Sequence, residues 1–107
     1  MSGLDMSGGV VINPMPPETR RDVTINYSGM LANAQGVSIC LNYGGAGQHF
    51  GNKEVSMKRV GNAFQATFQI DASDQLNFYF KDDQGKVDNN NGRGWSSQVA
   101  SDYQSYA

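Results

Sequence analysis

Apolar and polar side chains alternate in four short windows of the sequence: "DVTINY", "VSICLNY", "FQATFQI" and "LNFYF". Successive side chains of a β-strand point to opposite faces of the sheet, so a period of two is typical of a strand that buries one face. No stretch of about 11 residues sustains a helical period. The alternation therefore predicts an all-β fold with four clear strands.

Turn-forming residues separate these windows, as in "NPMPPE", "SGMLANAQG", "YGGAGQ", "DASDQ" and "DDQG". Gly, Pro, Asn and Asp favour tight turns, so each of these segments ends one strand and begins another. Weaker strand patterns lie at 10–12 and 55–60, and a last strand is expected within 95–103. Short strands joined by close turns predict an antiparallel β-sandwich.

The length of 107 residues suits a single domain with a single core. Residues 1–9 are polar or small, and we expect them to form a flexible N-terminal segment. Residues 10–103 would then form the sandwich.

The charge balance argues against nucleic-acid binding. Eight basic and ten acidic residues give a net charge of −2, which does not suit the neutralisation of phosphates. No apolar run is long enough to span a membrane, and the N-terminus lacks the basic and apolar regions of a secretory signal. We therefore expect a cytoplasmic protein, or a secreted one if the sequence has been trimmed.

Metal and cofactor motifs are incomplete. Cys40 is the single cysteine, so it is expected to be a small half-buried filler and not part of a disulfide or metal cluster. A calcium loop starting at Asp88 would place Asn90 correctly, but Gly92 and Val99 stand where two ligands belong. We expect no metal site and no cofactor.

Enzyme motifs are equally weak. Gly45 and Gly47 lack the third glycine of a dinucleotide fingerprint, because that position is Phe50. His49 has no carboxylate or nucleophile at a readable spacing. A hydrolase that uses Asp83 and Asp88 is the weakest hypothesis, since a loop on so small a sandwich offers little cleft. The sequence therefore favours a protein that is not an enzyme.

The segment "KVDNNNGRGW" at 86–95 combines amide side chains with the only tryptophan, Trp95. Carboxamides donate and accept hydrogen bonds without carrying charge, which suits the hydroxyl groups of a neutral sugar, and an aromatic ring can cover the sugar's C–H face. The same residue types also dominate turns, through local hydrogen bonds and tolerance of positive φ. The segment is thus either a turn, a sugar-binding loop, or both.

Three stretches together resemble a known family: "VTINYSGMLANAQGVSICLNYGGAGQHF", "FQATFQI" and "LNFYFKDDQGKVDNNNGRGW". They are similar to the starch-binding carbohydrate-binding modules of family 25 and its relatives in families 26 and 53. The resemblance covers roughly residues 10–96. It implies an immunoglobulin-like β-sandwich without catalytic activity that binds starch, maltooligosaccharides or glycogen. It also implies a glucan-active enzyme as a candidate partner.

The resemblance also implies a binding site. Phe50 stands about where similar modules carry a stacking tryptophan, and Val87 stands where they carry a second ring. Asp88, Asn89 and Asn90 match the family's Asp-Asn-Asn triplet. The full set of expected ligand-binding residues is Asn42, Tyr43, His49, Phe50, Lys81, Asp88, Asn89, Asn90 and Trp95.

Two hypotheses for the function follow. The first is a non-catalytic module that binds α-1,4-linked glucans by ring stacking and Asn/Asp hydrogen bonds. The second is a protein-interaction or assembly module of the same fold, whose sugar site has degenerated with the loss of a ring at Val87 and whose exposed aromatic residues mark an interface.

Overall fold

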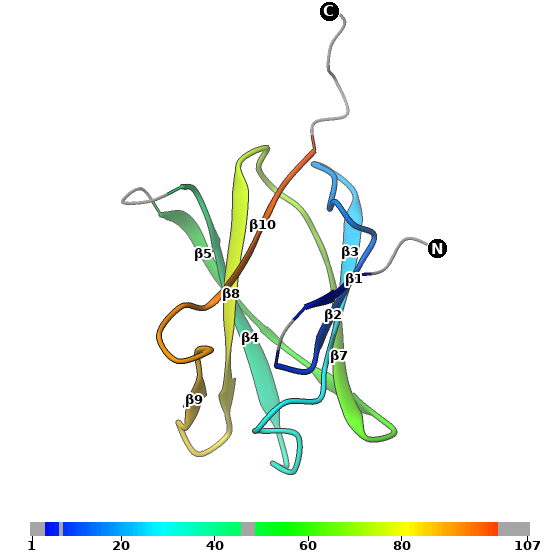
Figure 1. The fold of residues 1–107 in the computed structure, drawn as a ribbon, viewed down its shortest axis with the longest axis vertical. Coiled ribbons are helices and arrows are strands. Elements are labelled where there is room, and N and C mark those ends of the chain that lie inside the picture. The colour runs from blue at the N-terminus through cyan, green and yellow to red at the C-terminus, as the bar shows by residue number, and fades with distance from the viewer. Residues whose placement is uncertain (1–3, 7, 46–48, 101–107) are drawn as a thin grey trace, which may run out of the picture.

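The computed structural model describes residues 4–6, 8–45 and 49–100, and these form two antiparallel sheets packed face to face (Figure 1). No helix occurs among the described residues. The predicted all-β sandwich is confirmed.

The first sheet contains five strands in the order β1-β2-β3-β7-β6. Its members are β1 (Leu4–Met6), β2 (Val10–Asn13), β3 (Asp22–Tyr27), β7 (Ala63–Gln69) and β6 (Lys58–Val60). Every neighbouring pair is antiparallel, and the longest register joins β3 to β7.

The second sheet has the order β10-β8-β4-β5, and β9 pairs with β8 outside this path. Its members are β4 (Val37–Tyr43), β5 (Phe50–Ser56), β8 (Gln75–Asp82), β9 (Val87–Asp88) and β10 (Trp95–Gln98). This sheet carries the candidate site described below.

The strand order is that of an immunoglobulin-like sandwich. The runs β2-β3-β7-β6 and β10-β8-β4-β5 correspond to the orders A-B-E-D and G-F-C-C′ of that fold. A short parallel bridge between Glu18 and Ala100 also joins the segment after β2 to the end of β10. Each central strand therefore pairs with a strand distant in sequence.

The core lies between the sheets and contains the apolar phase of the four predicted windows. Ile25 of β3, Ile39 of β4, Phe64 of β7 and Phe80 of β8 are all buried there. Each large apolar side chain that is fully buried stabilises the fold by about 1.5–3 kcal/mol. Because side chains alternate along a strand, the residues of β4 and β8 that lie between the buried ones point to the outside of the second sheet.

The structure differs from the sequence-based prediction at the edges. Leu4–Met6, within the segment expected to be flexible, pairs with β2 as strand β1. The weak window at 55–60 is split: β5 ends at Ser56, Met57 is buried, and β6 begins at Lys58. Edge strands expose both faces to water, so their sequences need not alternate.

Candidate ligand-binding site

The outer face of the second sheet is polar and uncharged along its middle. On β8 the outward side chains are Gln75, Asn77 and Tyr79, which alternate with the buried Leu76 and Phe78. The register pairs Asn77 with Asn42 and Tyr79 with Cys40 of β4. These side chains lie next to one another because the two strands are hydrogen-bonded neighbours.

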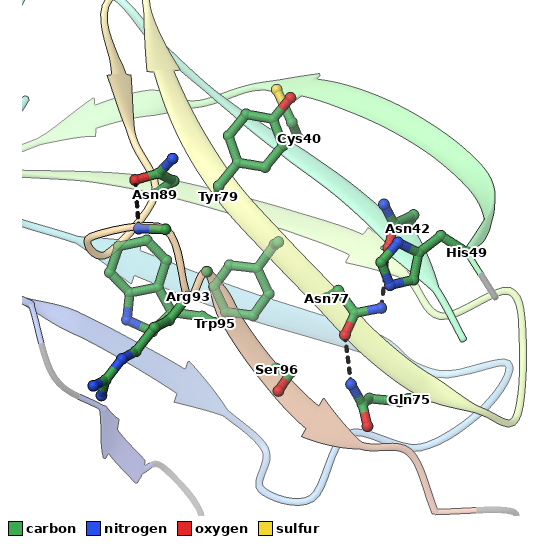
Figure 2. A pocket seen from close by; sticks show the side chains of 13 residues that line it. Cys40, Asn42, His49, Gln75, Asn77, Tyr79, Asn89, Arg93, Trp95 and Ser96 are labelled. Atoms are coloured by element: carbon green, nitrogen blue, oxygen red, sulfur yellow. Dashed lines mark hydrogen bonds between the residues drawn. The ribbon is translucent and has the colours of Figure 1, made fainter. Parts of the chain in front are cut away.

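A groove of about 520 Å³ lies over this face. We call it the face groove, and Figure 2 shows it from close by. β8 and β4 form its floor, and the loop that enters β10 forms one wall. The polar side chains that line it include Asn42, His49, Gln75, Asn77, Tyr79 and Asn89.

Hydrogen bonds between carboxamides hold the floor of the face groove in place. Gln75 Nε2 donates to Asn77 Oδ1 over 2.7 Å, and Asn77 Nδ2 donates to Asn42 Oδ1 over 3.0 Å (Figure 2). Asn77 Nδ2 also donates to the Gly44 carbonyl. Because each amide orients the next, the groove presents fixed donors and acceptors.

Tyr79 is the exposed ring of the face groove, with 38% of its surface accessible. Cys40 is its register neighbour on β4, and interaction with the Cys40 thiol raises the pKa of Tyr79. Burial raises the pKa of the Cys40 thiol. Both groups therefore stay uncharged at neutral pH, and Cys40 is half-buried, as expected from the sequence.

A second hollow of about 370 Å³, the side hollow, adjoins the face groove across Cys40, Asn42 and Tyr79. It extends to β5, where Lys81 Nζ lies 3.2 Å from Glu54 Oε1. This contact raises the pKa of Lys81. Lys81 therefore lines the side hollow as half of an ion pair, and not the face groove.

The "DNN" segment acts first as a turn. Asp88 is buried, its Oδ2 accepts a hydrogen bond from the Tyr27 hydroxyl, and its Oδ1 accepts one from the Asn90 amide. Asn90 has φ of 57° and donates from Nδ2 to the Gly94 carbonyl. These two residues of the triplet thus shape the loop.

Asn89 has a different place from its neighbours. It is exposed, and its Oδ1 accepts a hydrogen bond from the Gly92 amide over 3.0 Å (Figure 2). It lines the face groove and also a third hollow of about 360 Å³, the end hollow, where Met30 and Val87 are exposed. Asn89 therefore stands between two surfaces that a ligand can reach.

Two of the expected stacking rings are in the core. Tyr43 is 2% exposed, and its hydroxyl accepts a hydrogen bond from the Asp71 amide. Trp95 is 4% exposed and stacks on Phe78, with ring centroids 6.2 Å apart. Neither ring offers its face to a ligand, so the expectation that Tyr43 and Trp95 stack on a sugar is wrong. Trp95 contributes only to the walls of the face groove and the end hollow.

The two remaining expected residues are exposed, and Phe50 lines none of the three hollows. Phe50 begins β5 and is 48% exposed, and its ring centroid lies 6.1 Å from that of Tyr43. His49 is exposed and lines the face groove near Asn42 (Figure 2).

Sequence reasoning missed the residues at the centre of the groove. Gln75, Asn77 and Tyr79 occupy the outward phase of "QLNFYFKD", the same phase from which Lys81 was chosen. A tyrosine flanked by amides on the solvent face of a buried strand was the available signal. Asn52 of β5 was missed because its strand does not alternate.

In the ranges 4–6, 8–45 and 49–100, no group of three His, Cys, Asp or Glu residues is placed to hold a metal ion. The same part of the chain contains no helix long and apolar enough to cross a bilayer.

No protein-family model matches the sequence, and no curated protein or solved structure matches it. The resemblance to starch-binding modules therefore stays a hypothesis that depends on the quoted residues of the sequence.

Proposed function

We propose that this protein is a non-catalytic module that binds α-1,4-linked glucans in the face groove. The observation that carries the proposal is a fixed set of uncharged carboxamides beside an exposed ring, Tyr79. Sugar hydroxyls are both donors and acceptors, and they match carboxamides without the desolvation cost of a charge. The C–H face of a sugar ring can cover Tyr79.

The charged groups around the groove support a neutral ligand. Lys81 is paired with Glu54, and Lys53 lies 3.5 Å from Asp71. Arg93 is the charged residue that lines the face groove, and its side chain is exposed at the rim. An anionic ligand would find few unpaired cations in this part of the described chain. A neutral polyhydroxylated ligand needs none.

An open groove of this kind binds weakly. We expect a Kd between micromolar and millimolar, or about −4 to −8 kcal/mol. Attachment to a glucan-active enzyme, or a second copy of the module, would raise the effective concentration at a polymer without new contacts. Such an enzyme is the partner that the proposal implies.

A second candidate function is favoured by the end hollow. Met30 is 67% exposed and Val87 is 41% exposed, and both line this hollow. Exposed apolar side chains that gather at one place mark sites of protein interaction. In this alternative the end hollow docks a protein partner and the face groove is unoccupied.

A pull-down on insoluble starch, with cellulose as the control, tests the first function. We expect wild type to be retained on starch, Tyr79→Ala to be lost, and Phe50→Ala to be weakened. Thr67→Ala, an exposed position on the other sheet, should be retained like wild type. Equal retention of Tyr79→Ala and wild type would contradict the proposal. A starch-independent partner captured through Met30 would favour the second function.

A further inference from the structure

A row of polar side chains runs from β10 across β8 and β4 to β5 on the outer face of the second sheet, with a register shift between β4 and β5 at Asn42. The register places Ser96 of β10 opposite Asn77 of β8, and Asn77 opposite Asn42 of β4. Asn42 Nδ2 then donates to Asn52 Oδ1 of β5 over 3.3 Å. We call these four residues the amide row.

The hydrogen bonds of the amide row leave capacity for a ligand. An amide oxygen accepts two hydrogen bonds and an amide nitrogen donates two. The bonds between described residues use both N–H groups of Asn77, one N–H group of Asn42, and one lone pair of each amide oxygen in Asn77, Asn42 and Asn52. Asn77 can therefore only accept a further hydrogen bond, through Oδ1, while Asn42 and Asn52 keep both donor and acceptor capacity. These side chains are half-buried or exposed, so the remaining groups can meet a ligand on the solvent side.

The spacing of the amide row is set by the sheet. Hydrogen-bonded strands lie about 4.8 Å apart, so the three gaps from β10 to β5 span about 14 Å. The spacing of about 4.8 Å between neighbouring strands is comparable with the advance of one hexose unit along an extended glycan chain. Each unit of a chain laid across the strands would therefore meet one side chain of the row.

The neighbouring row supplies a surface for the ring faces. Tyr79 and Cys40 lie two residues along β8 and β4 from Asn77 and Asn42, and Tyr79 is exposed between the face groove and the side hollow. A chain that lies between the two rows would place its hydroxyl edge on the amides. Its central unit would cover Tyr79.

We propose that the amide row binds a neutral glycan in an extended form, across the strands, over three to four successive units. This inference rests on the proposed function, because it takes the ligand of the face groove to be a neutral sugar. A mono- or disaccharide, or a tightly coiled chain, would contact only one or two members of the row. Affinity should therefore depend on chain length up to the width of the sheet and no further.

Isothermal titration with oligosaccharides of one to seven glucose units, in an α-1,4 and a β-1,4 series, tests this. We expect affinity to rise about fivefold with each unit that gains one hydrogen bond, and to level off after three or four units. Asn77→Ala should weaken binding of the four-unit chain about tenfold and that of the disaccharide less than about threefold.

Gln65→Ala is the matched control, because Gln65 Nε2 donates to Asn26 Oδ1 over 3.0 Å in a cross-strand amide pair on the other sheet. It should bind every oligosaccharide like wild type. Urea unfolding verifies that Asn77→Ala is folded, and Gln75→Ala repeats the test at a position with fewer backbone contacts. A weaker loss of the same kind is expected for Gln75→Ala.

The outcomes separate the two proposals. A length-dependent series with β-linked chains alone would uphold the extended mode and refute the α-glucan function. Disaccharide binding as tight as that of the seven-unit chain, or Asn77→Ala equal to Gln65→Ala, would overturn the extended mode while the α-glucan function stands. Binding of neither series would refute both.

Discussion

Replacement of Tyr27 by phenylalanine removes one buried hydroxyl that connects two loops. This hydroxyl donates to Asp88 Oδ2 and accepts from the Leu31 amide over 3.0 Å. The ring itself stays, stacked on Phe80 with centroids 4.0 Å apart. Tyr27→Phe therefore isolates the hydrogen bonds from the burial of the ring.

The magnitude follows from those two bonds. Loss of a hydrogen bond to a charged partner costs about 1.5–3 kcal/mol, and Asp88 is buried. The Leu31 amide loses its acceptor, and an unsatisfied buried group costs about 1–3 kcal/mol. Because the loops can relax, the two losses are not fully additive. We expect Tyr27→Phe to lower the free energy of unfolding by about 3 kcal/mol.

Urea unfolding at neutral pH measures this loss of stability. The slope of the free energy of unfolding against urea concentration should be the same for Tyr27→Phe and wild type. Tyr43→Phe is the matched control, since its hydroxyl accepts one neutral bond from the Asp71 amide and should cost about 1 kcal/mol. If the free energies of unfolding of Tyr27→Phe and Tyr43→Phe agree within about 0.5 kcal/mol, the hydrogen bonds of Tyr27 to Asp88 and Leu31 do not stabilise the fold as argued, and the reasoning is refuted.

Three further outcomes are expected. Tyr79→Ala should weaken binding of maltoheptaose about tenfold, and Phe50→Ala should weaken it less, because Tyr79 lines the face groove and Phe50 does not. Isothermal titration measures both. Burial, followed by the hydrogen bond to Asp88, raises the pKa of Tyr27 well above its ordinary value. Above pH of about 10 the Tyr27 hydroxyl loses its proton in the unfolded chain before it does so in the folded protein. The free energy of unfolding should therefore fall with rising pH by up to about 1.4 kcal/mol per pH unit. In Tyr27→Phe this contribution to the pH dependence should be absent. The raised pKa of Cys40 should make its alkylation at pH of about 7.5 slower in the folded protein than in urea, and equal rates would contradict its burial.

The four alternating windows predicted the central strands because each of those strands buries one face. The windows "VSICLNY" and "LNFYF" became β4 and part of β8, whose apolar phases are in the core. β5 was missed over most of its length because Phe50–Ser56 is an edge strand exposed on both faces. Its partner β4 is the preceding strand, so the missing signal is not the pairing but the alternation, which is absent because neither face of β5 is buried.

The candidate site was harder to predict because its residues come from different strands and meet only through strand pairing. Asn42, Asn77 and Ser96 form a row only through the pairing of β4, β8 and β10. In the sequence each of them is an ordinary polar residue on the solvent side of a strand. The site therefore depends on strand register, which local alternation does not specify.

The triplet at 88–90 illustrates the limit of a local motif. Its composition fitted both a turn and a sugar site, and all three of its members make hydrogen bonds that shape the turn. Asp88 bonds to the Tyr27 hydroxyl and to the Asn90 amide, and Asn90 bonds to the Gly94 carbonyl. Asn89 accepts a bond from the Gly92 amide and also lines the face groove. Trp95, chosen for its ring, packs on Phe78 because it falls on the inward phase of β10.

The most direct test of the central claim is a titration of ¹⁵N-labelled protein with maltoheptaose, followed through the side-chain amide signals. Binding in the face groove should shift the amides of Asn42, Gln75 and Asn77 with one saturable Kd, while those of Asn26 and Gln65 on the other sheet stay unchanged. No shift at millimolar maltoheptaose, or equal shifts on both sheets, would contradict the account.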